Sequence, residues 1–165
     1  MGIQTIVYGR ITLKGDLEKN RQYLKSLADD SQFPWLRTEF FGAGATERPY
    51  YYQQPVIAFA ADYKALEYDW SDFMLKFEDL LRNIDFDTAK IHMETEFYGN
   101  YNFFWKSKTG TASFKEEDAL IETEEWFFGY GHRNAWGNLA EPLLAKHIFD
   151  IDFSYPVKRP GDHDF

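Results

Sequence analysis

The chain has 165 residues, a formal net charge of −9 and no cysteine. This length suits a single domain, which we place at residues 1–156, followed by a loose C-terminal tail at 157–165. The lack of cysteine excludes disulfides, cysteine metal sites and a thiol nucleophile. The acidic balance disfavours nucleic-acid phosphates and anionic lipid surfaces as partners. Neither a signal peptide nor an apolar run of about 18 residues is present, so we expect a cytoplasmic protein with no membrane partner.

The first half of the chain opens with a strand and a helix. Alternating apolar residues predict a strand over 3–13, and Gly15 and Asp16 end it and begin a helix. The apolar stripe of that helix runs from Leu17 to Ala28. Residues 31–54 are then irregular and rich in aromatic rings. Such a long segment is typical of a functional loop, and the alternative is a loop that its rings fix onto the core.

A short apolar run and a clear helix follow. The run Val56–Ala61 predicts a strand that is buried on both faces and is therefore central in its sheet. After Asp69, apolar residues recur at helical spacing as far as Ile84, with charged residues on the opposite side. This segment is the clearest helix of the sequence.

The second half predicts mainly strands. We expect a strand over 91–98, a hairpin partner over 101–106 joined by the turn at Gly99-Asn100, and a further strand over 119–128. A glycine-rich loop at 129–137, a short helix at 138–146 and a last strand at 149–153 complete the chain. This order predicts an α+β fold: a ferredoxin-like (split βαβ) antiparallel sheet with two main helices on one face, extended by C-terminal hairpin strands.

The first candidate site is a polar strand face. His92, Glu94 and Glu96 point the same way, and Glu122 and Glu124 would join them if their strand is a neighbour. Carboxylates with a histidine can hold a divalent metal or divide into acid and base roles. The alternative is the solvent face of a half-exposed sheet. Because H-x-E-x-E is not a recognised metal spacing, we expect no metal and no cofactor.

Two further candidates lie in the last third of the chain. In the glycine-rich loop, His132 offers a general base, Arg133 an anion-binding fork, and Tyr130 and Trp136 flat surfaces. The alternative for this loop is a surface turn. The third candidate is an acidic stretch, which is either a solvated patch or a contact surface for a basic groove. It comprises Glu116, Glu117, Asp118, Glu122 and Glu124.

No recognised catalytic motif is present: there is no G-x-S-x-G, no Walker loop and no H-E-x-x-H. Our first hypothesis is therefore a non-catalytic acidic binding or inhibitor protein for a basic protein partner. An immunity protein that neutralises a bacterial toxin is its concrete form. The partner contact would use the acidic stretch with Tyr130 and Trp136.

Two alternatives remain open at this point. A small metal- or anion-dependent enzyme, or a ligand-binding domain, would use His92, Glu94, Glu96 and His132, with Arg133 on an anionic group. An oligomeric module would bury the aromatic segment 31–54 between copies of the chain. The sequence ranks an enzyme below a binding protein, because no catalytic motif supports it.

Overall fold

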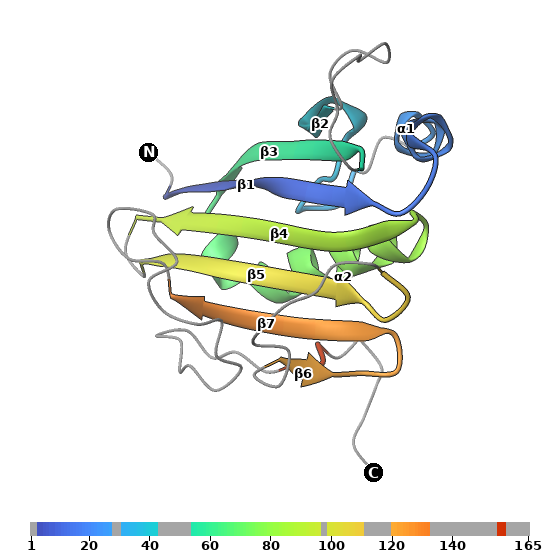
Figure 1. The fold of residues 1–165 in the computed structure, drawn as a ribbon. Coiled ribbons are helices and arrows are strands. Elements are labelled where there is room, and N and C mark those ends of the chain that lie inside the picture. The colour runs from blue at the N-terminus through green and yellow to red at the C-terminus, as the bar shows by residue number, and fades with distance from the viewer. Residues whose placement is uncertain are drawn as a thin grey trace.

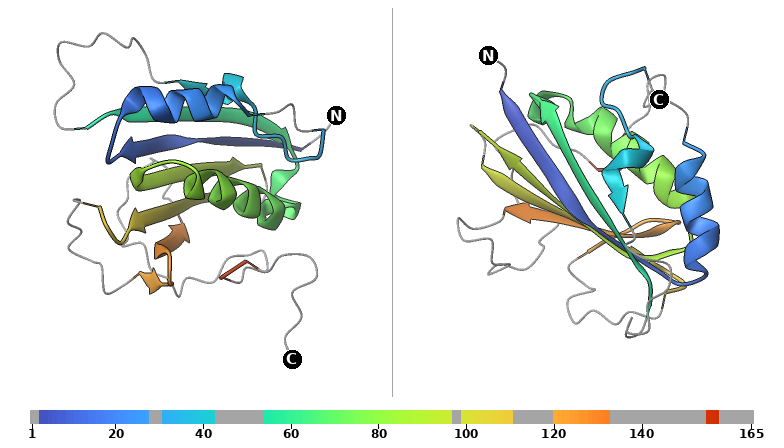
Figure 2. Two further views of the ribbon diagram at one scale, coloured as in Figure 1. Left: turned by 90° about the vertical axis from the view of Figure 1, so that its right-hand side faces the viewer. Right: turned by 90° about the horizontal axis from the view of Figure 1, so that it is seen from above.

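The structure, a computed structural model, describes residues 3–27, 31–42, 54–96, 99–110, 120–132 and 155–157. Over these ranges the chain is a mixed α+β protein with a seven-stranded antiparallel sheet. Figures 1 and 2 show that α1 (Leu17–Lys25) and α2 (Trp70–Arg82) both lie on one face of the sheet. No helix in the described part is long and apolar enough to cross a membrane.

The strands follow the order β2-β3-β1-β4-β5-β7-β6, and each neighbouring pair is antiparallel. Two 3-10 turns, η1 (Thr38–Phe40) and η2 (Leu66–Tyr68), precede β2 and α2. The strands are β1 (Gln4–Leu13), β2 (Phe41–Gly42), β3 (Val56–Lys64), β4 (Phe86–Thr95), β5 (Asn100–Ser107), β6 (Ile121–Glu122) and β7 (Trp126–His132).

Simple local patterns explain the first elements. In β1, Val7, Ile11 and Leu13 are fully buried, while the residues between them are more exposed. Asp16 is the N-cap of α1, and its carboxylate accepts a hydrogen bond from the backbone N–H of Glu18 at 2.9 Å. Such a cap satisfies one of the amide groups that a helix leaves unpaired at its start. The strand and the helix therefore form where the sequence predicts them.

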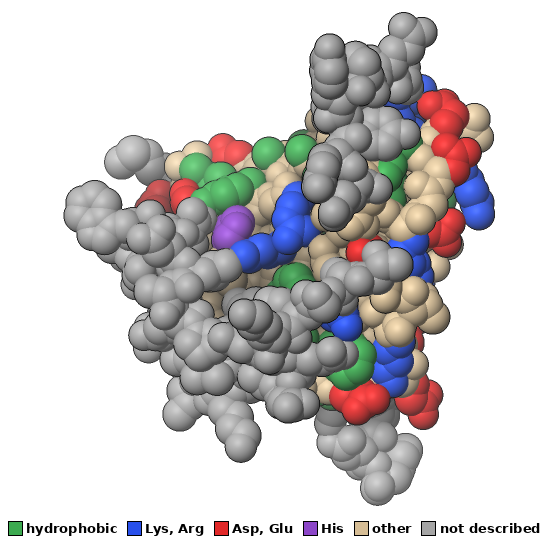
Figure 3. Space-filling model, viewed as in Figure 1, with side chains coloured by type: hydrophobic (Ala, Val, Ile, Leu, Met, Phe, Trp, Pro, Cys, Tyr) green, Lys and Arg blue, Asp and Glu red, His purple; other side chains and the backbone are tan. Residues whose placement is uncertain are grey.

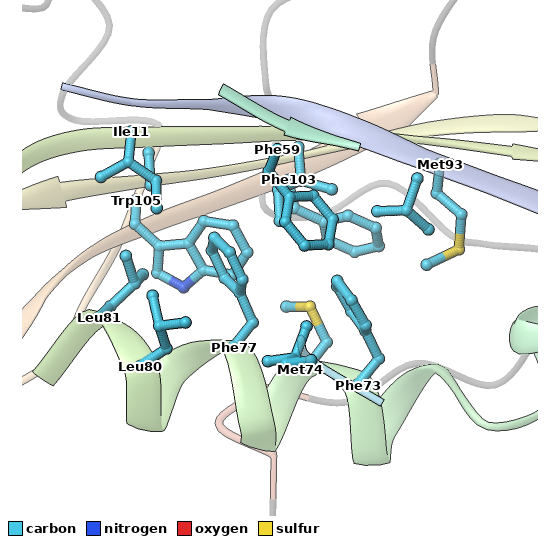
Figure 4. Close-up of a cluster of buried hydrophobic side chains, with 14 of the residues drawn as sticks. Ile11, Phe59, Phe73, Met74, Phe77, Leu80, Leu81, Met93, Phe103 and Trp105 are labelled. Atoms are coloured by element: carbon cyan, nitrogen blue, oxygen red, sulfur yellow. The ribbon is translucent and has the colours of Figure 1, made fainter. Parts of the chain in front are cut away.

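The core lies between α2 and the sheet (Figure 4). Phe73 and Phe77 project from α2 and are fully buried, with ring centroids 6.0 Å apart. Phe77 also meets Trp105 of β5 at 5.1 Å. Burying each such side chain contributes roughly 1.5–3 kcal/mol, so this layer supplies much of the stability of the fold.

The α+β class and both helices are confirmed, but the sheet is larger than expected. The prediction that the strand at 56–61 is central and buried on both faces is wrong. β3 alternates strictly between exposed and buried residues, and beyond it lies only the two-residue β2. Ala58 and Ala60 occupy the exposed face. Because alanine is small and apolar, the sequence reads as a continuous apolar run although only one face is covered.

The prediction of one strand over 119–128 is also wrong. The segment is a hairpin in which β6 and β7 are separated by a turn at 123–125. The Thr123 hydroxyl accepts hydrogen bonds from the backbone N–H groups of Glu125 and Trp126 at 3.2 and 3.1 Å. This local bonding reverses the chain. As a result, residues 129–132, predicted to begin a loop, continue β7.

The remaining predictions lie outside the described residues. They are the rest of the glycine-rich loop at 133–137, the helix at 138–146 and the strand at 149–153. Of the predicted tail at 157–165, the structure describes only Val157.

We predict that Gly9→Ala strongly destabilises the fold. A Cβ on Gly9 would lie 1.9 Å from the backbone oxygen of Lys90, where β1 pairs with β4. Backbone atoms of a central strand cannot move aside cheaply, so we expect a loss of about 3 kcal/mol or more in the free energy of unfolding. Urea denaturation followed by circular dichroism measures it.

Gly42→Ala is the matched control, because an added Cβ there meets nothing within 4 Å. We expect this variant to stay within about 0.5 kcal/mol of the wild type. Equal effects of the two substitutions would contradict the close β1–β4 packing.

Candidate functional site

The face of the sheet opposite the helices, which we call the open face, carries polar side chains on its middle strands. Register places Tyr8 of β1 opposite His92 of β4, and His92 opposite Asn102 of β5. Paired residues on antiparallel strands project to the same side, so these three lie in one row. Figure 3 views this face: a histidine and basic side chains are visible near its middle, and most acidic ones lie toward its margins.

These side chains bond to one another. The Tyr8 hydroxyl donates to Glu94 Oε1 at 2.9 Å, and the rings of Tyr8 and His92 are 5.1 Å apart. His92 Nδ1 shares a hydrogen bond with Asn102 Oδ1. Together with Arg10 we call these residues the open-face cluster: Tyr8, Arg10, His92, Glu94 and Asn102.

Asn102 is the most constrained member of the open-face cluster. It is fully buried, and its Nδ2 has no hydrogen-bond partner among the described residues. Whichever way the amide is turned, one end bonds His92 and the other end is left over. An unpaired buried polar group costs about 1–3 kcal/mol. Asn102 therefore has a hydrogen-bond donor that the described residues leave unsatisfied.

Arg10 adds a positive charge to the same cluster. Its Nη1 donates to Thr88 Oγ1 at 2.9 Å, and no carboxylate of the described residues forms an ion pair with it. Burial lowers the pKa of its guanidinium group, because removal from water disfavours the charged form. An anion placed against Arg10 would offset this desolvation.

The structure separates the acidic residues that the sequence grouped. His92 and Glu94 share the open face, but Glu96 lies beyond the end of β4 and accepts a hydrogen bond from the backbone N–H of Gln4. Glu122 belongs to β6, and two strands, β5 and β7, stand between β6 and β4. Glu122 pairs with Lys108 at 3.2 Å, and Glu124 is exposed in the nearby turn. The condition under which Glu122 and Glu124 would join the His92 face, that their strand neighbours β4, is therefore not met.

The other predicted residues fall into two groups. Tyr130 packs in the core with only 9% of its surface exposed, and burial raises the pKa of its hydroxyl. Glu116, Glu117, Asp118, Arg133 and Trp136 lie outside the described residues, as does the side chain of His132. Within the described ranges, no group of three or more His, Asp or Glu side chains is arranged to hold a metal ion.

A second feature lies at the β2–β3 end of the sheet. Phe33, Trp35, Phe40 and Tyr63 line a pocket of about 360 Å³, with Asp62 and Lys64 of β3 also in its wall. Phe33 and Trp35 are 39% and 41% exposed. The Tyr63 hydroxyl donates to the backbone oxygen of Trp35 at 2.5 Å, which ties the segment to β3. We call this the aromatic pocket.

Sequence reasoning missed parts of both features. The aromatic content of 31–54 indicated a functional segment, but nothing in the sequence indicated that Asp62 and Tyr63 of β3 complete the pocket. The alternation predicted for the strand over 3–13 places Tyr8 and Arg10 on the face opposite the apolar one, and the structure agrees. Their proximity to Glu94 and His92 depends on the β1–β4 register, which periodicity does not fix.

A buried carboxylate beneath α2 is a further chemical candidate, since perturbed acids often mark functional sites. Glu78 is 4% exposed, and its Oε2 accepts hydrogen bonds from Trp105 Nε1 at 2.9 Å and the Tyr155 hydroxyl at 2.7 Å. Tyr155 in turn accepts from Trp126 Nε1 at 2.6 Å and stacks on Phe128. Burial raises the pKa of Glu78. The network joins α2, the sheet and residue 155, which is a structural role.

Comparison of the chain with protein-family models, with curated proteins and with solved structures found no match.

We predict that Glu78→Gln flattens the pH dependence of stability. Because burial raises the pKa of Glu78, the folded state keeps its proton where the unfolded chain has lost it. The resulting stabilisation is complete below the unfolded pKa, near 4.5, and is lost as the pH rises through the folded pKa. Glutamine keeps an oxygen acceptor for Trp105 and Tyr155 and does not titrate.

Urea denaturation of both proteins at a series of pH values from about 4 to 8 measures this effect. The stability of the wild type relative to the variant should fall as the pH rises. Parallel stability curves would show that Glu78 titrates as it does in the unfolded chain.

Proposed function

We propose that the protein is a non-catalytic binding protein that contacts a basic protein partner through the aromatic pocket. The observation that carries this proposal is the exposure of Trp35 and Phe33 beside a pocket that remains open. Aromatic side chains dominate the binding energy at many interfaces, and two of them exposed side by side form an anchor for a partner.

The pocket favours a long cationic side chain, and we assign an arginine of the partner to it. Its rings meet edge to face, with centroids 6.3 Å apart for Phe33–Trp35 and 6.1 Å for Phe33–Tyr63. Such rings offer apolar surface to the stem of an arginine and a π face to its guanidinium group. Asp62 also lines the pocket and is exposed, and its Oδ2 accepts a hydrogen bond from Gln4 Nε2 at 3.0 Å.

The protein already uses this kind of contact internally. The guanidinium group of Arg37 lies 5.5 Å from the ring centre of Trp35, and that of Arg82 lies 5.0 Å from Trp126. The net charge of −9 would speed encounter with a basic protein. Glu122 and Glu124 lie at the opposite edge of the sheet, so we assign them to this long-range attraction and not to the contact itself.

The concrete form that we propose is an inhibitor of a basic enzyme, such as an immunity protein against a nuclease toxin. Two observations favour a binding role over catalysis. In the described part of the chain, His92 bonds an amide, while Glu94 bonds a tyrosine. The proposal also keeps the other predicted contact residues: three acidic residues that would attract the basic partner, Glu116, Glu117 and Asp118, and one aromatic residue that would contact it, Trp136.

We further propose that the first four strands form a ferredoxin-like unit. The order β2-β3-β1-β4 supports this, because α1 connects two strands that have β3 between them, and α2 connects two that have β1 between them. β5, β7 and β6 then extend the unit on the β4 side. The aromatic pocket lies at the end of the sheet away from this extension.

A second candidate function is binding of a small anion at the open-face cluster. Two groups favour it: the Nδ2 of Asn102, which has no hydrogen-bond partner in the described ranges, and the half-buried Arg10, with which no carboxylate of those ranges forms an ion pair. Both groups offer hydrogen-bond donors on one face of the sheet, which suits an oxyanion.

We predict that Trp35→Ala weakens partner binding at least about tenfold, because truncating an aromatic anchor removes most of its contact. Wild-type and variant proteins serve as baits in affinity capture from the native cells. The captured protein is then purified and titrated by calorimetry. A stoichiometric complex with a basic protein, weakened by added salt, is the expected result.

Val56→Ala is the control, since Val56 is also 41% exposed but sits at the other end of β3. It should leave affinity unchanged. Full binding by Trp35→Ala, or self-association of the chain through this pocket with no second protein, would refute the proposed contact.

For the open-face cluster we predict saturable binding of inorganic phosphate. The side-chain amide of Asn102 should shift in nuclear magnetic resonance spectra during the titration, because the anion occupies its unpaired end. Arg10→Gln should weaken binding at least about tenfold, the scale of one charge-assisted hydrogen bond. A phosphate titration that leaves the Asn102 amide unmoved would eliminate this second function.

A further inference from the structure

A separate pocket lies between α1 and the β2–β3 edge of the sheet. It measures about 270 Å³ and includes Arg21, Leu24 and Lys25 of α1 in its wall. Thr38 of η1, Phe41 of β2 and Ile57 of β3 line the other side. We call it the α1 pocket. Among the residues that the structure describes, the α1 pocket and the aromatic pocket share no lining residue.

Arg21 is the unusual residue of this pocket. Its Nη1 is buried and has no hydrogen-bond partner among the described residues. Glu18 Oε2 forms a long ion pair with this nitrogen at 4.0 Å, but it is half-exposed and too far away for a hydrogen bond. A guanidinium nitrogen that is removed from water without an acceptor is unfavourable in the free protein. The arrangement is explained if an oxygen of a ligand accepts from it.

The remaining lining defines the chemistry of that ligand. Lys25 provides a second cation, so the charged side of the pocket attracts an anion although the whole protein is acidic. Lys25 also complements the dipole at the end of α1, whereas Arg21 lies one turn earlier and gains no such stabilisation. Leu24, Phe41 and Ile57 provide an apolar wall opposite the charge.

We propose that the α1 pocket binds a small carboxylic acid with an apolar body. The carboxylate would accept hydrogen bonds from Arg21, a pairing whose geometry is favourable. The apolar body would pack on Leu24, Phe41 and Ile57. Because the pocket is near the lower end of the usual size range for ligand sites, the ligand is small. This site goes beyond the proposed protein contact and stands without it.

The test is a titration of the full chain with benzoate, followed by backbone amide shifts. Benzoate should bind saturably and shift the amides of Thr38 and Phe41. Benzamide, which lacks the charge, and inorganic phosphate, which lacks the apolar body, should shift them at least about tenfold more weakly. A shift of the Asn102 side-chain amide on addition of phosphate reports binding at the open-face cluster, and it is distinguished from the shifts of Thr38 and Phe41 that report the α1 pocket.

Variants of α1 give a second measurement. Arg21→Met keeps the length of the side chain without the charge, so it should abolish benzoate binding and raise the melting temperature of the free protein. Lys19→Gln, an equal loss of charge on an exposed residue of the same helix, should leave binding unchanged.

Three results would overturn the site. They are no saturable shift with benzoate, equal binding of benzamide and benzoate, or a lower melting temperature for Arg21→Met with binding retained. If Arg21→Met does not fold, two other measurements test the site: the titrations of the wild type with benzoate, benzamide and phosphate, and benzoate binding by the variant Arg21→Lys. Arg21→Lys keeps a cation but loses the fork, so it should bind benzoate more weakly than the wild type.

Discussion

The packing of the apolar face of α2 against the sheet is the interaction on which the rest of the structure depends. Phe73, Phe77 and Trp105 fill the space between the two layers and are fully buried (Figure 4). Because side chains alternate across a strand, filling one face of the sheet commits every second residue to the other. Tyr8, Arg10, His92 and Glu94 reach the open face for this reason.

Buried polar groups in this fold occur in two states: with their hydrogen bonds formed, or with a nitrogen atom that has no hydrogen bond in the described residues. Glu78 is buried and accepts hydrogen bonds from Trp105 and Tyr155, so it joins Tyr155 to the core. Asn102 is fully buried, and its Nδ2 has no hydrogen-bond partner in the described residues. Arg21 is half-buried, and its buried Nη1 lacks a hydrogen bond there and lies 4.0 Å from Glu18 Oε2. Folded proteins rarely leave such groups unpaired. The first state stabilises structure, and the second is typical of sites that a ligand or partner completes.

Hydrophobic periodicity predicted the elements whose apolar spacing fits only one type of secondary structure. The helix after Asp69 and the strand over 3–13 have clear apolar spacing, and the structure confirms them as α2 and β1. The strand over 101–106 was predicted from the turn at Gly99-Asn100, and the structure confirms it as β5. Periodicity failed at β3, because Ala58 and Ala60 are apolar residues on its solvent-exposed face and make the strand read as buried on both faces. It also failed near Thr123, where a side-chain hydroxyl bonds the backbone and turns the chain. Neither effect is visible in hydrophobic spacing alone.

The sites were harder to predict than the elements, because they depend on contacts between distant segments. His92 and Glu94 were recognised from one strand, but Asn102, Tyr8 and Arg10 join them only through strand register. The aromatic pocket likewise combines residues 33–40 with Asp62 and Tyr63. The sequence indicated a segment rich in aromatic rings at 31–54, and only the tertiary structure shows which rings lie exposed beside a pocket.

The central claim is that the aromatic pocket is the surface that meets a protein partner. Amide hydrogen exchange of the chain, free and in the complex with its captured partner, tests it most directly. The account predicts slower exchange in segments 33–40 and 60–64 on binding, with little change in the turn at 123–125. Protection confined to other segments, with 33–40 exchanging as in the free protein, would contradict it.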